Sequence, residues 1–265
     1  MESCYPDLVL SKAALLLSLV SCACSAPVNP SFQLSIDDAN RALAGMGARR
    51  VPLERPLVVI AGYNDPGIAA PFFKKTFGGV VTNPQWVVDV TPDGSTFDEF
   101  RKQLLDAVDR AFGGGETTET IEVDVVALSM GGLVARYAAV DDRQQHRQRL
   151  KIARLFTLST PHRGAKLAWV PTFSAVQKDM RPGSQFLKRL PHPDYPVYAY
   201  ARLGDNIVGE ENAAMEGQYP WWVANRPMED AHLACYSDPR LLADIARRLR
   251  NEPGYATWPP TAFPK

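Results

Sequence analysis

Residues 125–137 read Val-Val-Ala-Leu-Ser-Met-Gly-Gly-Leu-Val-Ala-Arg-Tyr, an apolar run that passes within two residues into a sequence with helical spacing. A continuous apolar run is typical of a strand that is buried on both faces of a parallel sheet. Ser129 stands at the junction, with Ala127 two positions before it and Gly131 two positions after it. A tight strand-to-helix turn requires small residues at these two positions, because larger side chains would clash there.

The alternation of strand-like and helix-like runs extends outward from this junction along most of the chain. Strands are predicted at 57–61, 86–90, 121–128, 152–159 and 197–201, with a last strand candidate at 221–224, and helices at 97–112, 131–140 and 239–249. Such alternation predicts an α/β fold, with a mostly parallel central sheet covered by helices on both faces.

Periodicity is lost between residues 161 and 196, where prolines and aromatic residues are scattered. We expect this segment to form a cap at residues 163–195, inserted after the strand that follows the Ser129 helix. Residues 27–265 are predicted to be a single domain that ends in a Pro-rich tail without regular structure at 253–265.

Residues 1–26 have the pattern of a signal segment, with a short apolar run at 13–20. Eight apolar residues are too few to span a bilayer, so we expect no transmembrane helix. Residues 19–22, Leu-Val-Ser-Cys, resemble the lipobox of bacterial lipoproteins, in which Cys22 would become the lipid-modified first residue. The alternative is a signal without lipid that is cut near Ala26. Either reading predicts an exported protein, as a cell-envelope lipoprotein or in secreted form.

The charge balance and the absence of metal motifs exclude several classes of function. Lys plus Arg equals Asp plus Glu at 29 each, so no net field would attract nucleic acid or an anionic bilayer. The sequence has no His-Glu-x-x-His or Cys-x-x-Cys motif, and no Gly-rich loop for a dinucleotide or phosphate follows a predicted strand. We therefore expect neither metal nor cofactor. Cys235 is interpreted as inert packing rather than as a catalytic thiol.

The strand, Ser129 and the following helix form the nucleophile-elbow arrangement. On these residues the chain resembles bacterial lipases and esterases of the α/β-hydrolase superfamily, including lipases whose elbow reads Ala-x-Ser-x-Gly. Ser-Thr-Pro-His-Arg-Gly at 159–164 is similar to the stretch after the next strand in these enzymes. The resemblance covers about residues 57–250 and implies a serine hydrolase that cleaves carboxylic esters, with Ser129 as nucleophile.

The resemblance also implies the partners of Ser129, because this superfamily orders its residues as serine, acid, histidine. It places the base at His232, although the chain also has His146, His162 and His192. Asp205 follows the strand after the predicted cap, in an Asp-x-Ile/Val-Val setting that is similar to that of related lipases. The acid is therefore expected at Asp205, with Glu210 or Glu211 as alternatives.

Two backbone N–H groups are expected to form the oxyanion hole. The helix that begins beyond Ser129 supplies that of Met130. In similar lipases the second N–H belongs to the residue after a His-Gly pair that follows the first strand. Here that pair reads Ala61-Gly62, so the donor maps to Tyr63.

Several functions would fit the same residues. A triad does not specify its leaving group, so a thioesterase, an amidase or an acyltransferase would use the same machinery. A non-catalytic, lipid-anchored binding protein with this fold is the alternative from another class. A small-molecule or lipid ester remains the expected partner.

Overall fold

A parallel sheet forms the centre of the molecule in the computed structural model, which describes residues 26–113, 118–141 and 148–264. Its six strands within these ranges are β1 (Leu57–Ile60), β2 (Val87–Val90), β3 (Val123–Leu128), β4 (Ile152–Leu158), β5 (Val197–Arg202) and β6 (Trp221–Val223). They lie in the order β2-β1-β3-β4-β5-β6, and every neighbouring pair is parallel. The predicted fold class, an α/β-hydrolase fold with a mostly parallel sheet, is confirmed.

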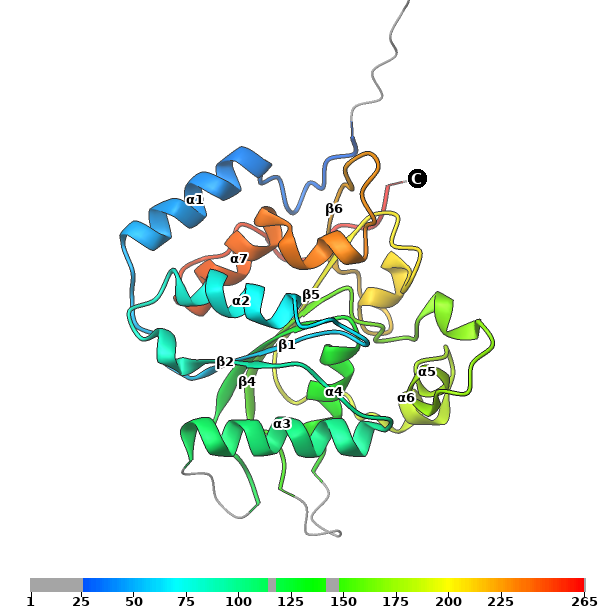
Figure 1. Cartoon of the computed structure of the whole chain (residues 1–265). Helices are drawn as coiled ribbons and strands as arrows, with labels where there is room; N and C mark the ends of the chain where they lie inside the picture. Colours follow the sequence, from blue (N-terminus) through cyan, green and yellow to red (C-terminus); the bar gives the residue numbers. More distant parts are fainter. Residues whose placement is uncertain (1–25, 114–117, 142–147, 265) are drawn as a thin grey trace, which may run out of the picture.

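Helices cover both faces of this sheet (Figure 1). The helices α1 (Ile36–Ala48), α2 (Ala69–Gly78) and α7 (Pro239–Leu249) lie on one face, and α3 (Phe97–Phe112) and α4 (Met130–Ala138) on the other. Side chains alternate between the faces along each strand, so Leu57 and Val59 join one apolar core while Val58 and Ile60 join the other. Burial on both sides explains why β1 reads as an unbroken apolar run, and why β3 is apolar except for Asp124, whose carboxylate pairs with Arg154.

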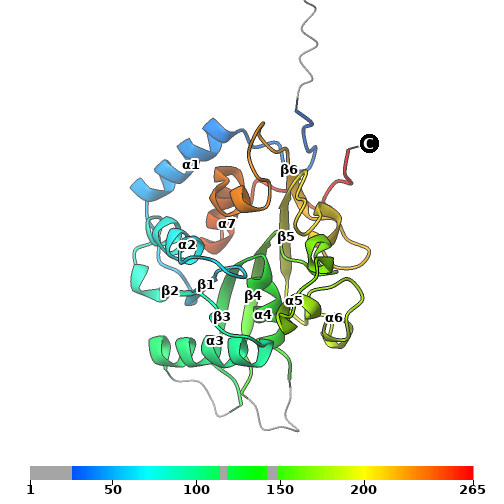
Figure 2. The ribbon, with the colours of Figure 1, turned by 45° about the vertical axis from the view of Figure 1, so that its right-hand side comes forward.

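Shorter helices occupy the connections. These are η1 (Pro84–Trp86), η3 (Lys166–Trp169), α5 (Ala175–Asp179), α6 (Gln185–Arg189), η4 (Glu210–Ala213) and η5 (Leu233–Ser237). Figure 2 shows α5 and α6 beside α4, in the segment for which a cap was predicted. Phe186 of α6 stacks on Phe97 of α3 with ring centroids 3.9 Å apart, and Val176 and Met180 are buried. This part of the segment is therefore packed on the α3–α4 side of the molecule.

Besides these short helices, the longer helices α1 and α2 were not predicted from the sequence. Ser35 caps α1 by accepting a hydrogen bond from the N–H of Asp38. Asp65 accepts hydrogen bonds from the N–H groups of Gly67 and Ile68 just before α2 begins. The other predicted elements are present, with ends that differ by one or two residues.

The C-terminal residues 253–264 contain no helix or strand and pack along β6. The indole N–H groups of Trp221 and Trp222 donate to the carbonyls of Thr257 and Thr261. The structure does not describe residues 1–25, so the predicted signal segment and the lipidation call at Cys22 lie outside it. Within the described ranges, no helix has the length and apolar character needed to cross a membrane.

Candidate active site

Ser129 occupies the one-residue junction between β3 and α4. Its backbone has φ 50° and ψ −126°, in the left-handed half of the map that residues other than glycine rarely occupy. Hydrogen bonds hold this conformation, since the Ser129 N–H donates to the carbonyl of Leu158 (2.8 Å) and the Thr160 hydroxyl donates to the Ser129 carbonyl (2.8 Å). Strain that is fixed in this way is characteristic of functional residues.

Gly131 and Gly132, the second and third residues after Ser129, lie where α4 begins in close contact with two other segments. A Cβ atom on Gly131 would lie 2.5 Å from the carbonyl oxygen of Ala61. One on Gly132 would overlap the Thr160 side chain. The requirement for small residues, which the sequence suggested for Gly131, thus comes from the approach of α4 to the end of β1. For Gly132 it comes from the loop after β4.

The structure brings Ser129, His232 and Asp205 together, although they are far apart in the sequence. His232 Nε2 lies 3.0 Å from Ser129 Oγ, and His232 Nδ1 lies 2.9 Å from Asp205 Oδ2. Ser129 follows β3, Asp205 follows β5, and His232 lies in the loop after β6. Parallel strands end at the same edge of a sheet, so these three connections converge there. We call this edge the carboxyl edge.

The Asp205 carboxylate is almost completely buried but well supplied with donors. Its Oδ1 accepts hydrogen bonds from the N–H groups of Ile207 (3.0 Å) and Val208 (2.9 Å), while Oδ2 faces His232. Burial acts to raise the pKa of Asp205, but the hydrogen bond and charge of His232 and the Val208 N–H outweigh it and lower the pKa. Asp205 is therefore an anion at neutral pH.

Arg202, which sequence reasoning did not single out, fixes the loop that carries His232. Its side chain is 0% exposed. It donates to the carbonyl of Ala234 (3.1 Å) and to the Glu229 carboxylate, and its Nε lies 3.7 Å from Asp238 Oδ2. Glu229 and Asp238 stand on opposite sides of His232 in the sequence, so one buried cation holds both ends of the loop. One sequence feature could have indicated Arg202: it is the last residue of the otherwise uncharged strand Val-Tyr-Ala-Tyr-Ala-Arg, and an arginine in a buried strand needs partners.

The residues expected to form an oxyanion hole lie on either side of Ser129. A Cβ atom on Gly62 would be 3.2 Å from Ser129 Cβ, which places the loop after β1 directly against the serine. Among the described residues, the N–H groups of Tyr63 and Met130 donate to no other protein atom. Both are therefore available to a bound oxygen. The Tyr63 hydroxyl lies 3.1 Å from Ser174 Oγ, at the start of α5.

The alternative candidates are placed differently. His162 is buried between Thr157 Oγ1 (3.1 Å from Nε2) and the Arg136 guanidinium (3.3 Å from Nδ1), and burial together with the Arg136 charge holds its pKa well below the usual value. His192 is exposed and contacts the carbonyl of Pro193, and His146 lies outside the described residues.

Glu211, one of the alternative acids, and the thiol of Cys235 lie in surroundings that do not suit a catalytic role. Glu211 pairs with Lys166 at 3.0 Å instead of with a histidine. Cys235 is buried, and burial raises the pKa of its thiol to about 12, which makes it a poor nucleophile. No cluster of three or more His, Cys, Asp or Glu side chains in the described ranges has an arrangement suited to a metal ion.

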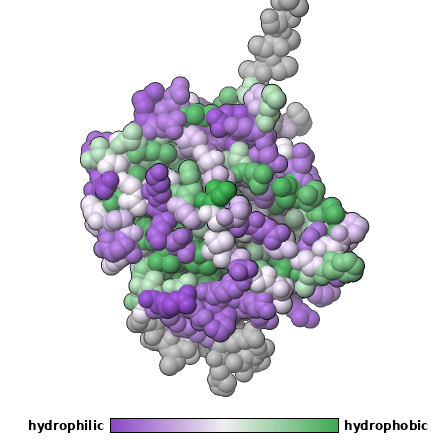
Figure 3. Space-filling model, in the orientation of Figure 1, coloured by the Kyte–Doolittle hydropathy of each residue, from purple (hydrophilic) through white to green (hydrophobic). Residues whose placement is uncertain are grey.

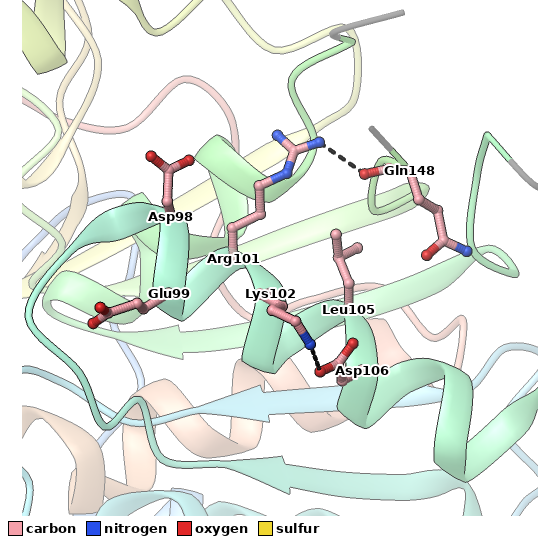
Figure 4. Close-up of a pocket in the computed structure, with 7 residues that line it drawn as sticks. All are labelled: Asp98, Glu99, Arg101, Lys102, Leu105, Asp106 and Gln148. Carbon is pink, nitrogen blue, oxygen red and sulfur yellow. Dashed lines mark hydrogen bonds and ion pairs between the residues drawn. The ribbon is translucent and has the colours of Figure 1, made fainter. Parts of the chain in front are cut away.

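Two surface cavities differ in their relation to the site. A depression of about 440 Å³ along α3 has mainly charged walls, with a hydrogen bond from Arg101 to the carbonyl of Gln148 and an ion pair between Lys102 and Asp106 (Figure 4). It contains none of the site residues. A second cavity, of about 400 Å³, lies between the loops after β1 and β2 and includes Tyr63 in its wall. The second cavity therefore adjoins the expected oxyanion loop.

Comparisons with known proteins agree with the fold. Residues 92–185 match the family model described as a PGAP1-like alpha/beta domain. Phospholipase PlaB from Legionella pneumophila, in complex with thio-NAD, matches 76% of this chain and 59% of its own chain, with 10% identity and a TM-score of 0.55. A second structure of that phospholipase gives 12% identity, 74% and 60% coverage, and a TM-score of 0.51. The chain thus spans about three fifths of the phospholipase, and no curated protein matches it.

Proposed function

Because the chain has the fold of the α/β-hydrolase superfamily, we propose that it is a serine hydrolase that cleaves carboxylic esters through Ser129. The observation that carries this proposal is the hydrogen-bonded series Asp205–His232–Ser129 at the nucleophile elbow. Each member has a separate chemical task. A serine hydroxyl is almost wholly protonated at neutral pH and needs a base, and the base needs a group that orients it.

In the first half of the reaction, His232 Nε2 accepts the proton of Ser129 as Oγ attacks the ester carbonyl carbon. The N–H groups of Tyr63 and Met130 bind the oxyanion that forms on the carbonyl oxygen. His232 then gives its proton to the departing alkoxide, the carbon–oxygen bond breaks, and the acyl group remains on Ser129. Asp205 keeps the Nδ1 proton in place and stabilises the charged imidazole.

In the second half, His232 accepts a proton from water, and the resulting hydroxide attacks the acyl carbon. The tetrahedral intermediate collapses, Ser129 recovers its proton from His232, and a carboxylic acid leaves. A thioester or an amide would pass through the same steps. The cavity beside Tyr63 is where we propose that part of the substrate lies during both halves.

A fluorophosphonate probe with mass spectrometry tests the nucleophile, because only an activated serine is labelled. We expect labelling at Ser129, no labelling of Ser129→Ala, and strongly reduced labelling of His232→Ala. Ester turnover in Ser129→Ala should fall by roughly 10³ to 10⁶. Near-normal turnover in that folded variant would overturn the proposal. A series of esters, thioesters and amides with matched acyl chains then identifies the preferred leaving group.

A further inference from the structure

Large hydrophobic side chains are exposed mainly at the carboxyl edge of the sheet. Seven of the eleven exposed large hydrophobic residues in the described ranges lie in the loops that follow β1, β4 and β6. Four of the seven are in the segment 163–190, namely Leu167, Trp169, Val170 and Phe173. The other three are Ile68, Met228 and Leu233. We call these seven residues the apolar rim.

The exposure of the rim is too large and too localised for an ordinary surface. Phe173 is 102% exposed and Met228 105%, so these two side chains bury almost none of their apolar area, and Trp169 leaves 60% of its area exposed. Single exposed hydrophobic residues are common, but a group of them beside one site marks an interaction surface. Figure 3 shows hydrophobic residues at the surface on the right-hand side, where Figure 1 places α5 and α6.

Residues 163–190 carry an excess of positive charge, although the net charge of the whole chain is zero. Residues 163–190 contain six lysine or arginine residues and one acidic residue, Asp179, against 29 of each sign in the full chain. Lys178, Lys188 and Arg189 form no ion pair with any residue that the structure describes. The Arg181 guanidinium lies 5.3 Å from the ring centroid of Trp169, so cation and aromatic ring share one surface.

Hydrogen bonds join this basic segment to the site. The N–H groups of Lys166 and Leu167 donate to the carbonyls of Val208 (3.2 Å) and Ile207 (3.0 Å). Those two residues donate their own N–H groups to Asp205. On the other side, Ser174 contacts the Tyr63 hydroxyl. The exposed residues between these two anchor points therefore stand at the border of the Ser129 site.

We propose that the apolar rim and the cations of residues 163–190 dock the protein on an anionic lipid surface. Aromatic and aliphatic side chains beside lysine and arginine are the combination that binds at the boundary between headgroups and acyl chains. The cations supply the selectivity for negatively charged headgroups. If the proposed function holds, on which this last step rests, the ester is a lipid that reaches Ser129 directly from the docked surface.

The test measures co-flotation of the full chain with vesicles of phosphatidylcholine, with and without phosphatidylserine. All proteins carry Cys22→Ser, so that no lipid attached there contributes. We expect binding that requires phosphatidylserine and weakens as salt is added. Lys178→Glu, Lys188→Glu and Arg189→Glu together should reduce the partition coefficient by roughly a hundredfold or more, at about fivefold for each removed charge.

Matched controls separate the rim from general surface properties. Arg49→Glu, Arg50→Glu and Lys75→Glu remove the same charge near the opposite edge, at the ends of α1 and α2, and should retain vesicle binding. Trp169→Ser with Phe173→Ser should lose it, whereas Trp86→Ser, before β2, should not. None of these residues belongs to the catalytic machinery, so turnover of a short soluble ester should be unchanged in every variant.

Three outcomes overturn the docking proposal. The first is equal vesicle binding by the rim variants and their controls, and the second is no vesicle binding by the parent chain. The third is self-association that depends on Phe173 in light scattering, which would assign the rim to a second copy of the chain. Vesicle binding without hydrolysis of any ester would instead refute the proposed function and leave the docking surface standing.

Discussion

Replacing Asp205 with asparagine tests the assignment of the acid while changing few atoms. The two side chains have nearly the same shape, so the amide oxygen retains the hydrogen bonds from Ile207 and Val208. The amide nitrogen then faces His232 Nδ1, 2.9 Å away, and it is a donor where the carboxylate was an acceptor. His232 must accept at Nδ1 and therefore carry its proton on Nε2.

That tautomer cannot perform the proposed reaction. With a proton on Nε2, His232 donates to Ser129 Oγ across the 3.0 Å contact and cannot accept the serine proton. The imidazolium that forms during catalysis also loses its compensating charge. We expect turnover to fall by about 10⁴-fold, which corresponds to about 5.4 kcal/mol of transition-state stabilisation.

The assay compares kcat/KM for an activated ester at neutral pH in the wild type, Asp205→Asn, Glu210→Gln and Glu211→Gln. Thermal unfolding of each protein shows whether it is folded. Glu211 pairs with Lys166 at the surface, so its variant should stay close to wild-type turnover. The reasoning is wrong if Asp205→Asn keeps more than about a tenth of wild-type kcat/KM while a glutamate variant does not.

Three further predictions concern the oxyanion loop, the elbow and acid stability. Tyr63→Pro, which removes the N–H, should cost about 2.7 to 4 kcal/mol in kcat/KM, and Tyr63→Ala much less; equal losses would indicate a role for the side chain. Gly132→Ala should lower the free energy of unfolding in urea by about 1 to 3 kcal/mol, because its Cβ overlaps Thr160, whereas Gly78→Ala, with no contact shorter than 3.5 Å, should not lower it. In the folded protein the pKa of Asp205 lies below its ordinary value of 3.8, so near that pH the unfolded chain binds more protons. This group therefore stabilises the fold above about pH 4 and loses that contribution as the pH falls further. The Tm of the wild type should fall more in acid than that of Asp205→Asn, and a constant difference in Tm would contradict this.

The strands and the elbow were predictable because their signals are local. A strand that is buried on both faces is apolar along most of its length. This holds throughout β1, and in β3 everywhere except Asp124, which is paired with Arg154. Ser129 was recognisable from its small neighbours alone. His232 had no comparable local signature, and only the order of residues in the resembling superfamily indicated it. Asp205 was indicated by that order together with its Asp-x-Ile/Val-Val setting.

The helices α1 and α2 were missed because the local sequence gives only a weak pattern for each of them. In α1 the only fully buried positions are Ala39 and Met46, and the rest of the helix is half-exposed or exposed, so its apolar stripe is narrow. The Ser35-x-x-Asp38 cap was a usable signal for its start. In α2 the aromatic residues Phe73 and Phe77 face the core, but the preceding Pro-Gly pair favoured a loop.

In the segment predicted to form a cap, the sequence pattern does not show which apolar residues are buried. Among the larger apolar residues of this segment, Val176 and Met180 are buried, Phe186 and Leu187 are partly buried, and Leu167, Trp169, Val170 and Phe173 are exposed. Composition alone cannot separate these groups, because helices of five residues are too short to show a periodic face.

The loop from Asp205 to Val208 connects the chemistry of the site with its surface. Its N–H groups orient the carboxylate, while its carbonyls accept hydrogen bonds from Lys166 and Leu167 at the base of the basic segment. Ile207 and Val208 thus each bond to Asp205 through the N–H and to the basic segment through the carbonyl. A lipid surface in contact with Leu167 would therefore be linked to Asp205 through the hydrogen bonds of Ile207. The proposed docking surface and the proposed triad therefore share one hydrogen-bonded support, and we expect the site to be assembled already when the protein reaches the membrane.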